Sequence, residues 1–392
     1  MEGLALTADH AARGKHAAVS EGYWSDAFVG CFSRGGFDAS PGPLINRGQY
    51  ARVAAIASAI EQFLSATAGQ AAQIVSLGAG FDTCFWQLQA AGAAPRLYVE
   101  LDQDDVVRAK CSQIAAKPML HRALAPEGAA CVTPNGISSG SSGYRLLPVD
   151  LNDVAQLERA LSQAGWTPAQ PTLVIAECVL VYMVPEASRA IVDFFGKACA
   201  RAVLVAYEMV GPDDPFGRTM LQNLRRRGCP LLGLSAVPTV QAQQERCLSC
   251  GWSRAEAMEM LAFFDQVVGP DERARVCRIG LLDELEEWRM LLSHYCVALA
   301  VLDDAASPIF GNVTLRRPAN TPPLAALATA SNGSAANGTA ANATEAEPVA
   351  VPTMRRPPLG DTFDEADEAA VWSDEEESVE AVTGQAEGMA VS

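Results

Sequence analysis

The fold of this chain is indicated by the segment Ile74-Val75-Ser76-Leu77-Gly78-Ala79-Gly80-Phe81-Asp82-Thr83, in which an apolar strand leads into a Gly-x-Gly loop. A second short strand, Val99-Glu100-Leu101-Asp102, follows about 20 residues later and ends in an acid. In open α/β folds such glycines let the backbone approach a ligand, and the acid accepts hydrogen bonds from ribose hydroxyls. The segment therefore predicts a site for an adenosine-containing cofactor.

The loop departs from the full dinucleotide fingerprint Gly-x-Gly-x-x-Gly, because position 83 is Thr83 rather than glycine. The third glycine serves the close helix approach at a pyrophosphate. A sulfonium nucleoside has less need of that approach, so the loop favours S-adenosylmethionine over NAD. A dehydrogenase is also disfavoured because the sequence contains no Tyr-x-x-x-Lys pattern and no candidate catalytic histidine.

Composition and charge limit the classes of protein that the chain can belong to. Of its 392 residues, 49 % are hydrophobic and 19 % are charged, which is enough for a sizeable core. No apolar run approaches the roughly 18 residues of a membrane span, and the first residues lack the positively charged, then apolar, pattern of a signal segment, so we expect neither a membrane span nor secretion. The 11 cysteines are scattered, as reduced thiols are, and the lone pair Cys247 and Cys250 is a weak metal signal.

The net charge of −17 is spread unevenly, because residues 301–392 carry 15 acids and 4 bases. No broad basic face is implied, so nucleic acid is not an expected partner. We expect a monomer that binds neither metal nor membrane and that is located in the cytoplasm, with the nucleus as a second location.

Three regions follow from the sequence pattern. Residues 1–72 are predicted to form a helical N-terminal cover. Strand and helix patterns alternate over 73–302, which predicts βαβ units and a mostly parallel sheet, with a substrate-binding insertion at about 209–260. Residues 303–392 are rich in Ala, Asn, Pro, Thr, Ser and Gly and include the acidic run Asp374–Glu377, so we expect a disordered tail.

Hydrophobic patterns place the individual elements of the alternating region. The predicted strands are 73–77, 97–101, 145–149, 172–177, 202–207 and 294–299. The predicted helices are 83–91, 104–115, 153–163 and 186–200, followed by two more at about 215–227 and 239–249. The stretch 124–144 is rich in Gly, Ser and Ala and is expected to be a long loop.

Acids that follow predicted strands are the first candidates for the site, because ligands bind at the carboxyl ends of strands in open α/β sheets. We expect Asp102 to bind ribose, with Glu100 as a second candidate for the same role. Asp150, together with the backbone amide of Leu151, suits the amino group and a ring nitrogen of adenine. The alternative role of Asp150 is to cap the following helix.

The acid Glu177 lies in the apolar stretch Ala176-Glu177-Cys178-Val179-Leu180-Val181-Tyr182-Met183, where a charge needs a partner. The amino group of a cofactor would serve, and a structural ion pair is the alternative. Tyr182 is either a core tyrosine or a hydrogen-bond donor at the site. Among the N-terminal cations, Lys15, Arg47 and Arg52 could each bind a carboxylate, and arginine does so with two hydrogen bonds.

At these residues the chain resembles the leucine carboxyl methyltransferase family, from about Lys15 to Leu299. The matching stretches are Val19-Ser20-Glu21-Gly22-Tyr23-Trp24, Ile45-Asn46-Arg47-Gly48, Leu77-Gly78-Ala79-Gly80, Ala176–Met183, Asn223-Leu224-Arg225-Arg226-Arg227, Gln244-Glu245-Arg246 and His294-Tyr295-Cys296. The stretches 176–183 and 223–227 are far more specific than the glycine loop. Phe81 and Cys84 depart from the family pattern, which has Met and Thr there.

The resemblance implies a fold, a cofactor and an acceptor. The fold is a Rossmann-like, seven-stranded S-adenosylmethionine-dependent methyltransferase sheet with a helical N-terminal cover and inserted lid helices. The acceptor is the C-terminal leucine carboxylate of the protein phosphatase 2A catalytic subunit, which is bound as such or within its core dimer. The resemblance assigns cofactor roles to Lys15, Arg52, Gly78, Asp102, Asp150, Leu151 and Glu177. It places Lys15, Arg52 and Tyr182 at the methionine carboxylate and the reactive centre.

A carboxylate acceptor simplifies the expected chemistry. A C-terminal carboxyl group has a pKa of about 3.3–3.7, so at neutral pH it is already a nucleophilic anion and no general base is required. Three alternatives stay open: an O-methyltransferase for a small-molecule carboxylate, a methyltransferase for a modified tRNA base, and a cofactor-binding phosphatase partner without activity. Relatives that act on tRNA carry a long repeat domain after the methyltransferase, whereas an acidic tail is expected here.

Overall fold

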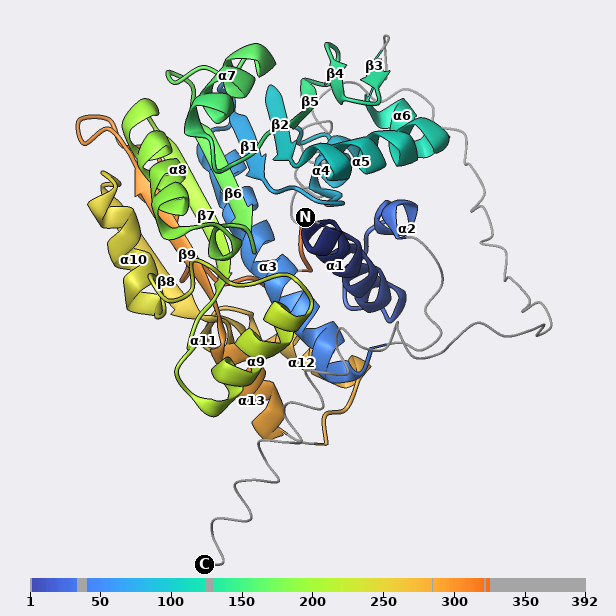
Figure 1. Cartoon of the computed structure of the whole chain (residues 1–392), viewed down its shortest axis with the longest axis vertical. Coiled ribbons are helices and arrows are strands. Elements are labelled where there is room, and N and C mark those ends of the chain that lie inside the picture. Colours follow the sequence, from blue (N-terminus) through green and yellow to red (C-terminus); the bar gives the residue numbers. More distant parts are fainter. Residues whose placement is uncertain (1, 34–40, 125–129, 284, 321, 325–392) are drawn as a thin grey trace, which may run out of the picture.

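The computed structural model describes residues 2–33, 41–124, 130–283, 285–320 and 322–324. Nine strands form one sheet in the order β3-β4-β5-β2-β1-β6-β7-β9-β8 (Figure 1). In chain order they are β1 Gln73–Leu77, β2 Leu97–Asp102, β3 Ala130–Thr133, β4 Gly136–Ser139, β5 Tyr144–Pro148, β6 Thr172–Glu177, β7 Ala202–Met209, β8 Arg254–Glu259 and β9 Tyr295–Leu302.

The strand order reverses at β1, which has β2 on one side and β6 on the other. Strands β5, β2, β1, β6 and β7 are parallel, and β9 is antiparallel to both β7 and β8. Leu77 at the end of β1 pairs with Leu101 of β2 and with Ala176 of β6. The loops after these three strands therefore meet at one edge of the sheet, where a switch in strand order opens a crevice for a ligand.

Helices cover both faces of the sheet (Figure 1). Their bounds are α1 Glu2–Ser20, α2 Val29–Phe32, α3 Pro43–Ala66, α4 Cys84–Ala90, α5 Asp104–Ala116, α6 Pro118–Leu124, α7 Val154–Ala164, α8 Pro185–Ala198, α9 Pro215–Arg226, α10 Val240–Ser249, α11 Met260–Gln266, α12 Pro270–Ile279 and α13 Leu285–Ser293, with a 3₁₀ turn at Leu180–Tyr182. None of the described helices is both long enough and apolar enough to cross a membrane.

Two apolar cores lie on the two faces because strand side chains alternate in direction. Ile74 and Leu173 pack on one face with the side chains of α3 and α4, whereas Val75 and Val174 pack on the other face with α7 and α8. Helix α1 packs against α3 and α5, so the N-terminal region lies over the edge where β1, β2 and β6 end.

Two helices begin at acidic N-cap residues that the sequence supplies. The carboxylate of Asp153 accepts the N–H of Gln156 at the start of α7, and the carboxylate of Asp214 accepts the N–H of Gly217 at the start of α9. Each satisfies a backbone N–H that the first helical turn leaves without a partner.

The predicted seven-stranded sheet differs from the structure in its strand count. Seven strands, from β5 to β8 in the sheet order, form the predicted part, and β8 is the strand whose position the sequence pattern did not locate. The other two, β3 and β4, form an antiparallel hairpin in the stretch that we expected to be a loop. Both are four residues long and contain small or polar residues, so they lack the alternation that marks a strand.

The folded region also extends beyond the boundary predicted at residue 303. Phe310, Val313 and Leu315 are buried, and the ring of Phe310 stacks on Phe63 with 5.7 Å between centroids. Arg254 donates to the carbonyl oxygens of Phe310 and Val313 at 2.9 and 2.8 Å. The apolar residues are too widely spaced among polar ones to have been recognised as core. The acidic run 374–377 lies outside the described residues.

The expected insertion at about 209–260 is only partly separate from the sheet. Helix α10 packs on β8 and β9 beside α8, so residues 240–259 belong to the sheet and its cover. Helix α9 and the loop after it are the part that stands at the carboxyl edge of the sheet.

Candidate functional site

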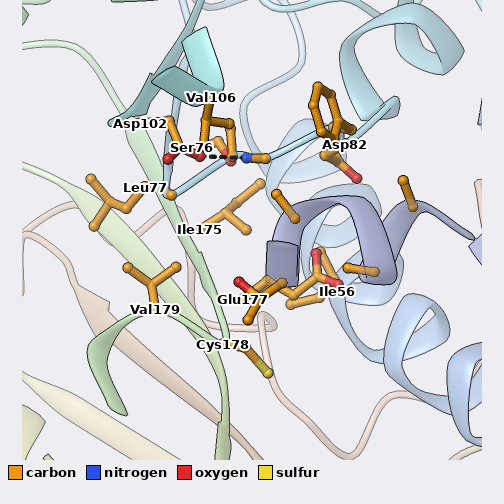
Figure 2. Close-up of a pocket in the computed structure, with 18 of the residues that line it drawn as sticks. Ile56, Ser76, Leu77, Asp82, Asp102, Val106, Ile175, Glu177, Cys178 and Val179 are labelled. Carbon is orange, nitrogen blue, oxygen red and sulfur yellow. Dashed lines mark hydrogen bonds between the residues drawn. The ribbon is translucent and has the colours of Figure 1, made fainter. Parts of the chain in front are cut away.

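A cavity of about 710 Å³ lies at the carboxyl ends of β1, β2 and β6. Its walls include the loops after these strands and the facing sides of α1 and α3 (Figure 2). The C-terminal end of α9 completes them. This volume is in the range of small-molecule and cofactor sites.

The glycine loop forms the floor of the cavity. Gly78 has φ +56°, and a Cβ atom there would lie 2.6 Å from Cγ2 of Val179, so a side chain fits neither the backbone conformation nor the space. The Gly80 N–H donates to Oδ2 of Asp102 at 2.6 Å, the hydrogen bond that is dashed in Figure 2. The loop thus presents bare backbone to the cavity, which is what close approach of a nucleoside requires.

The acids predicted after β2 and β5 both line this cavity. Burial raises the pKa of Asp102, and the N–H groups of Gly80 and Gln103, which donate to its two oxygens, act against that shift. Asp150 accepts the N–H of Asn152 at 2.9 Å. Because Asp153 caps α7, the carboxylate of Asp150 is not required as a helix cap, and it lines the cavity beside Leu151.

Two cations converge on Glu177 at the end of β6. Lys15, from α1, places its Nζ 2.8 Å from Oε1 of Glu177, and Arg52, from α3, places its Nε 2.5 Å from the same oxygen. Burial alone would raise the pKa of Glu177, but Lys15 and Arg52 outweigh it and lower that pKa to about 2. Glu177 is therefore an anion at neutral pH.

The same cluster is suited to an amino-acid zwitterion. Lys15 Nζ also lies 3.3 Å from Oδ1 of Asp82, and the guanidinium of Arg52 lies over the ring of Tyr207, 5.2 Å from its centroid. Two cations beside two carboxylates offer partners to both an α-carboxylate and an α-ammonium group. A methionine moiety carries both groups, so these residues fit the amino-acid end of S-adenosylmethionine.

Tyr182 lines the cavity from the 3₁₀ turn after β6. Burial, and to a smaller extent the nearby Cys178, raises the pKa of the Tyr182 phenol well above its usual value. The phenol therefore stays protonated at neutral pH and is able to donate a hydrogen bond, but not to act as a base.

Some candidates lie elsewhere. Glu100 is fully buried below the loop, where Lys110 contacts its Oε2 at 2.6 Å and Tyr144 donates to the same oxygen at 2.6 Å, so the suggested ribose role is wrong. Arg47 donates to the carbonyl oxygen of Gly280 at 2.7 Å and has a structural role. In the run 225–227, only Arg227 lines the cavity.

Sequence reasoning overlooked Asp82 and Glu208. Asp82 was quoted in the glycine loop, but its contact with Lys15 depends on how α1 packs. Glu208 is the only charged residue of β7 and is buried. The argument applied to Glu177, that a charge in an apolar strand needs a partner, would have identified Glu208 as well.

The reversal of strand order at β1, the glycine loop and the acid at the end of β2 define the Rossmann-like, S-adenosylmethionine-dependent methyltransferase fold. Residues 8–196 match the sequence model of the family described as leucine carboxyl methyltransferase. The leucine carboxyl methyltransferase 1 homolog of Arabidopsis thaliana is 41 % identical over 79 % of this chain and 92 % of its own length. The Bos taurus leucine carboxyl methyltransferase 1 is 37 % identical over 76 % and 90 %.

The chain therefore belongs to the leucine carboxyl methyltransferase family, and its cofactor is S-adenosylmethionine. A tRNA wybutosine-synthesizing protein 4 of Rattus norvegicus is 36 % identical over 78 % of this chain, but over only 45 % of its own length.

Proposed function

We propose that the chain transfers a methyl group to the α-carboxylate of the C-terminal leucine of the protein phosphatase 2A catalytic subunit, forming a methyl ester. One observation carries this proposal: the residues that the family resemblance singles out all line one cavity. They are Lys15, Arg52, Gly78, Asp102, Asp150, Leu151, Glu177 and Tyr182.

We assign the cofactor's adenosine end to Asp102, Asp150 and the glycine loop, and its amino-acid end to Lys15, Arg52 and Glu177. When bound, S-adenosylmethionine supplies an electrophilic methyl group on a sulfonium sulfur. The protein then has to bring a carboxylate oxygen into line with that methyl group and to exclude water. The acceptor carboxylate is already ionised, so none of these residues has to remove a proton.

The remaining wall of the cavity suits the acceptor. Leu224 and Cys229, from the end of α9 and the loop after it, face the cavity together with Met209 and Tyr295. These side chains are largely apolar, as a leucine side chain requires, and Arg227 adds a cation beside them. The phosphatase catalytic subunit, or its core dimer, and a cytoplasmic location are parts of this proposal.

The test is transfer of tritium from labelled S-adenosylmethionine to the purified phosphatase 2A core dimer. A core dimer that lacks only the C-terminal leucine is the matched control. Base-labile label on the intact dimer alone would support the proposal, since methyl esters hydrolyse in base. A third sample with total tRNA covers the acceptor class suggested by the wybutosine-related relatives. Label on tRNA alone, or no label despite cofactor binding, would refute the phosphatase acceptor.

A further inference from the structure

The end of β6 and the turn that follows it line the cavity with Glu177, Cys178, Val179, Tyr182 and Met183. Glu177 ends the strand, Val179 lies against Gly78, and Tyr182 completes the turn. Cys178 between them has φ +55°, a left-handed conformation that residues other than glycine rarely adopt. Such a conformation persists only where the surroundings hold it in place. Contacts from neighbouring elements must therefore fix this turn.

The buried side chain of Glu208 accepts hydrogen bonds from the backbone of this turn. Glu208 of β7 is 1 % exposed and does not line the cavity. Its Oε1 accepts the N–H of Leu180 at 2.9 Å and of Val179 at 3.4 Å, and its Oε2 accepts the N–H of Val181 at 3.1 Å. Strand pairing explains the placement, because Tyr207 lies opposite Glu177 and Glu208 is the next residue of β7.

The number of N–H donors in the turn explains why residue 208 carries a carboxyl group. Three consecutive backbone N–H groups point at one side chain, and an ionised carboxylate consists only of acceptors. A glutamine in its place would offer one acceptor oxygen, and its NH₂ group would face N–H donors. The turn has the form of a small backbone nest, and it is closed around a carboxyl group that is part of the protein. Burial raises the pKa of Glu208 to about 7, and Arg246 and the N–H groups of the turn act against that shift.

A second contact, made by the loop after α9, also fixes this turn. The N–H of Gly233, in the loop after α9, donates to the carbonyl oxygen of Val181 at 2.9 Å. A Cβ atom on Gly233 would lie 2.9 Å from the oxygen of Leu180 and 3.1 Å from that of Met183. The turn is thus confined between β7 and the α9 loop, which also forms the acceptor wall of the cavity.

We infer that Glu208 is a positioning residue for methyl transfer: it fixes the turn 178–182 so that Tyr182 holds its place at the reactive end of the cavity. This inference rests on the proposed function, because it assigns Glu208 to the methyl-transfer step. Glu208 acts through the turn and touches neither cofactor nor acceptor.

The test compares Glu208→Gln with Glu256→Gln in the full chain. Glu256 is a matched control because its carboxylate also accepts a backbone N–H, that of Leu315 at 3.3 Å, but lies on β8 away from the turn. We expect Glu208→Gln to lower kcat about 100-fold, the effect of a misplacement of about 1 Å at a reacting centre. The KM for S-adenosylmethionine should change less than about threefold, since Asp102 and Asp150 are untouched.

Amide hydrogen exchange of residues 179–181 gives a readout that requires no acceptor. Exchange should be at least about tenfold faster in Glu208→Gln than in the wild type or in Glu256→Gln. Unchanged exchange would show that Glu208 does not hold the turn, even if the phosphatase proves to be the wrong acceptor. Absence of wild-type transfer would refute the proposed function alone.

Gly233→Ala would place a Cβ atom against the carbonyl oxygens of the same turn and leave Glu208 unchanged. This variant therefore tests whether the position of the turn controls kcat if Glu208→Gln fails to fold. The inference predicts the same selective loss of kcat in this variant. It is overturned if either folded variant keeps kcat within about twofold of the wild type, or if kcat falls no further in Glu208→Gln than in Glu256→Gln.

Discussion

Buried charges at the cavity show how single residues depend on their partners. Glu177 and Glu100 are both acids in apolar strands, but Glu177 meets two cations that lower its pKa to about 2. Burial raises the pKa of Glu100 to about 7, although Lys110 and Tyr144 act against that shift. The sequence pattern indicated that Glu177 needs a partner, and it made Glu100 a second candidate for ribose binding. It did not indicate which partner each one has, because Lys15, Arg52 and Lys110 come from three different helices.

Arg52→Ala is expected to reduce methyl transfer strongly. The variant leaves Lys15 to pair with Glu177, so the fold should persist. Glu177 and the α-carboxylate of the cofactor, however, lose the guanidinium group of Arg52 as a partner. We expect kcat/KM to fall at least about 100-fold, or about 2.7 kcal/mol. Arg52→Lys should recover part of it, because an ammonium group lacks the paired donors of arginine.

The matched control for this substitution is Arg108→Ala, which removes an exposed arginine on α5. Both variants would be assayed with the phosphatase acceptor, and folding would be checked by circular dichroism. Turnover at the wild-type level in folded Arg52→Ala would contradict the role assigned to Arg52.

Glu177 should make stability depend on pH in the acid range. Its folded-state pKa of about 2 lies below the ordinary value of 4.5, so the folded state binds this proton less readily than the unfolded state. The stabilisation is then fully present above pH 4.5 and is lost as the pH falls towards 2. One such group contributes at most about 3 kcal/mol.

Urea unfolding of the wild type and Glu177→Gln at several pH values measures this contribution. The variant should be the less stable protein at pH 7, and the difference between the two free energies of unfolding should shrink between pH 4.5 and 3. A difference that does not change over this interval would argue against the ion pairs of Glu177 with Lys15 and Arg52.

At the scale of elements, the glycine loop and the turn after β6 pack closely against each other. Gly78 and Val179 come from loops about 100 residues apart in the chain, and parallel pairing of β1 with β6 brings them together. The strands were predictable because buried parallel strands are continuous apolar runs. The hairpin of β3 and β4 was not, because its short strands gain their stability from pairing with β5 rather than from their own composition.

Gly78→Ala is expected to weaken cofactor binding at least about tenfold and to lower the free energy of unfolding by about 1–2 kcal/mol. The backbone cost follows from the positive φ of Gly78, and the new Cβ atom would contact Val179. Isothermal titration with S-adenosylhomocysteine and urea unfolding measure the two effects.

Gly48→Ala is the control for this substitution. Gly48 lies within α3, and outside the neighbouring turns of that helix no described atom lies within 4 Å of the position that a Cβ atom would take, so alanine should be neutral or stabilising by up to about 1 kcal/mol. Equal effects of the two substitutions on cofactor binding would refute the close packing of Gly78 and Val179.

At the scale of the whole molecule, the end of the folded region is set by contacts between residues that lie far apart in the sequence. Gln62 of α3 donates to the carbonyl oxygen of Thr314 and accepts its N–H at 3.0 Å, which fastens the segment after β9 onto the N-terminal cover. The folded region therefore includes residues 303–315 as well as the sheet.

Two truncations test this boundary. A chain ending at Leu324 should keep methyl transfer within about twofold and its unfolding temperature almost unchanged, because it retains the sheet, the helices and the cavity-lining residues named above. A chain ending at Leu302 also loses the buried Phe310 and should be destabilised by at least about 4 kcal/mol. Thermal unfolding and methyl transfer of both proteins are the measurements. Loss of transfer in the longer chain would assign a function to residues 325–392, and full stability of the shorter one would refute the packing of Phe310.

The sequence by itself determined the sheet class, the glycine loop, the acids after the strands and the family, because these features depend on local patterns of apolar residues and on short motifs. Only the tertiary structure decided which charges meet. Lys15, Arg52 and Glu177 are separated by up to 162 residues, and Glu208 holds a turn 27 to 29 residues before it. Such contacts follow from how helices and strands pack in three dimensions, and no local pattern encodes them.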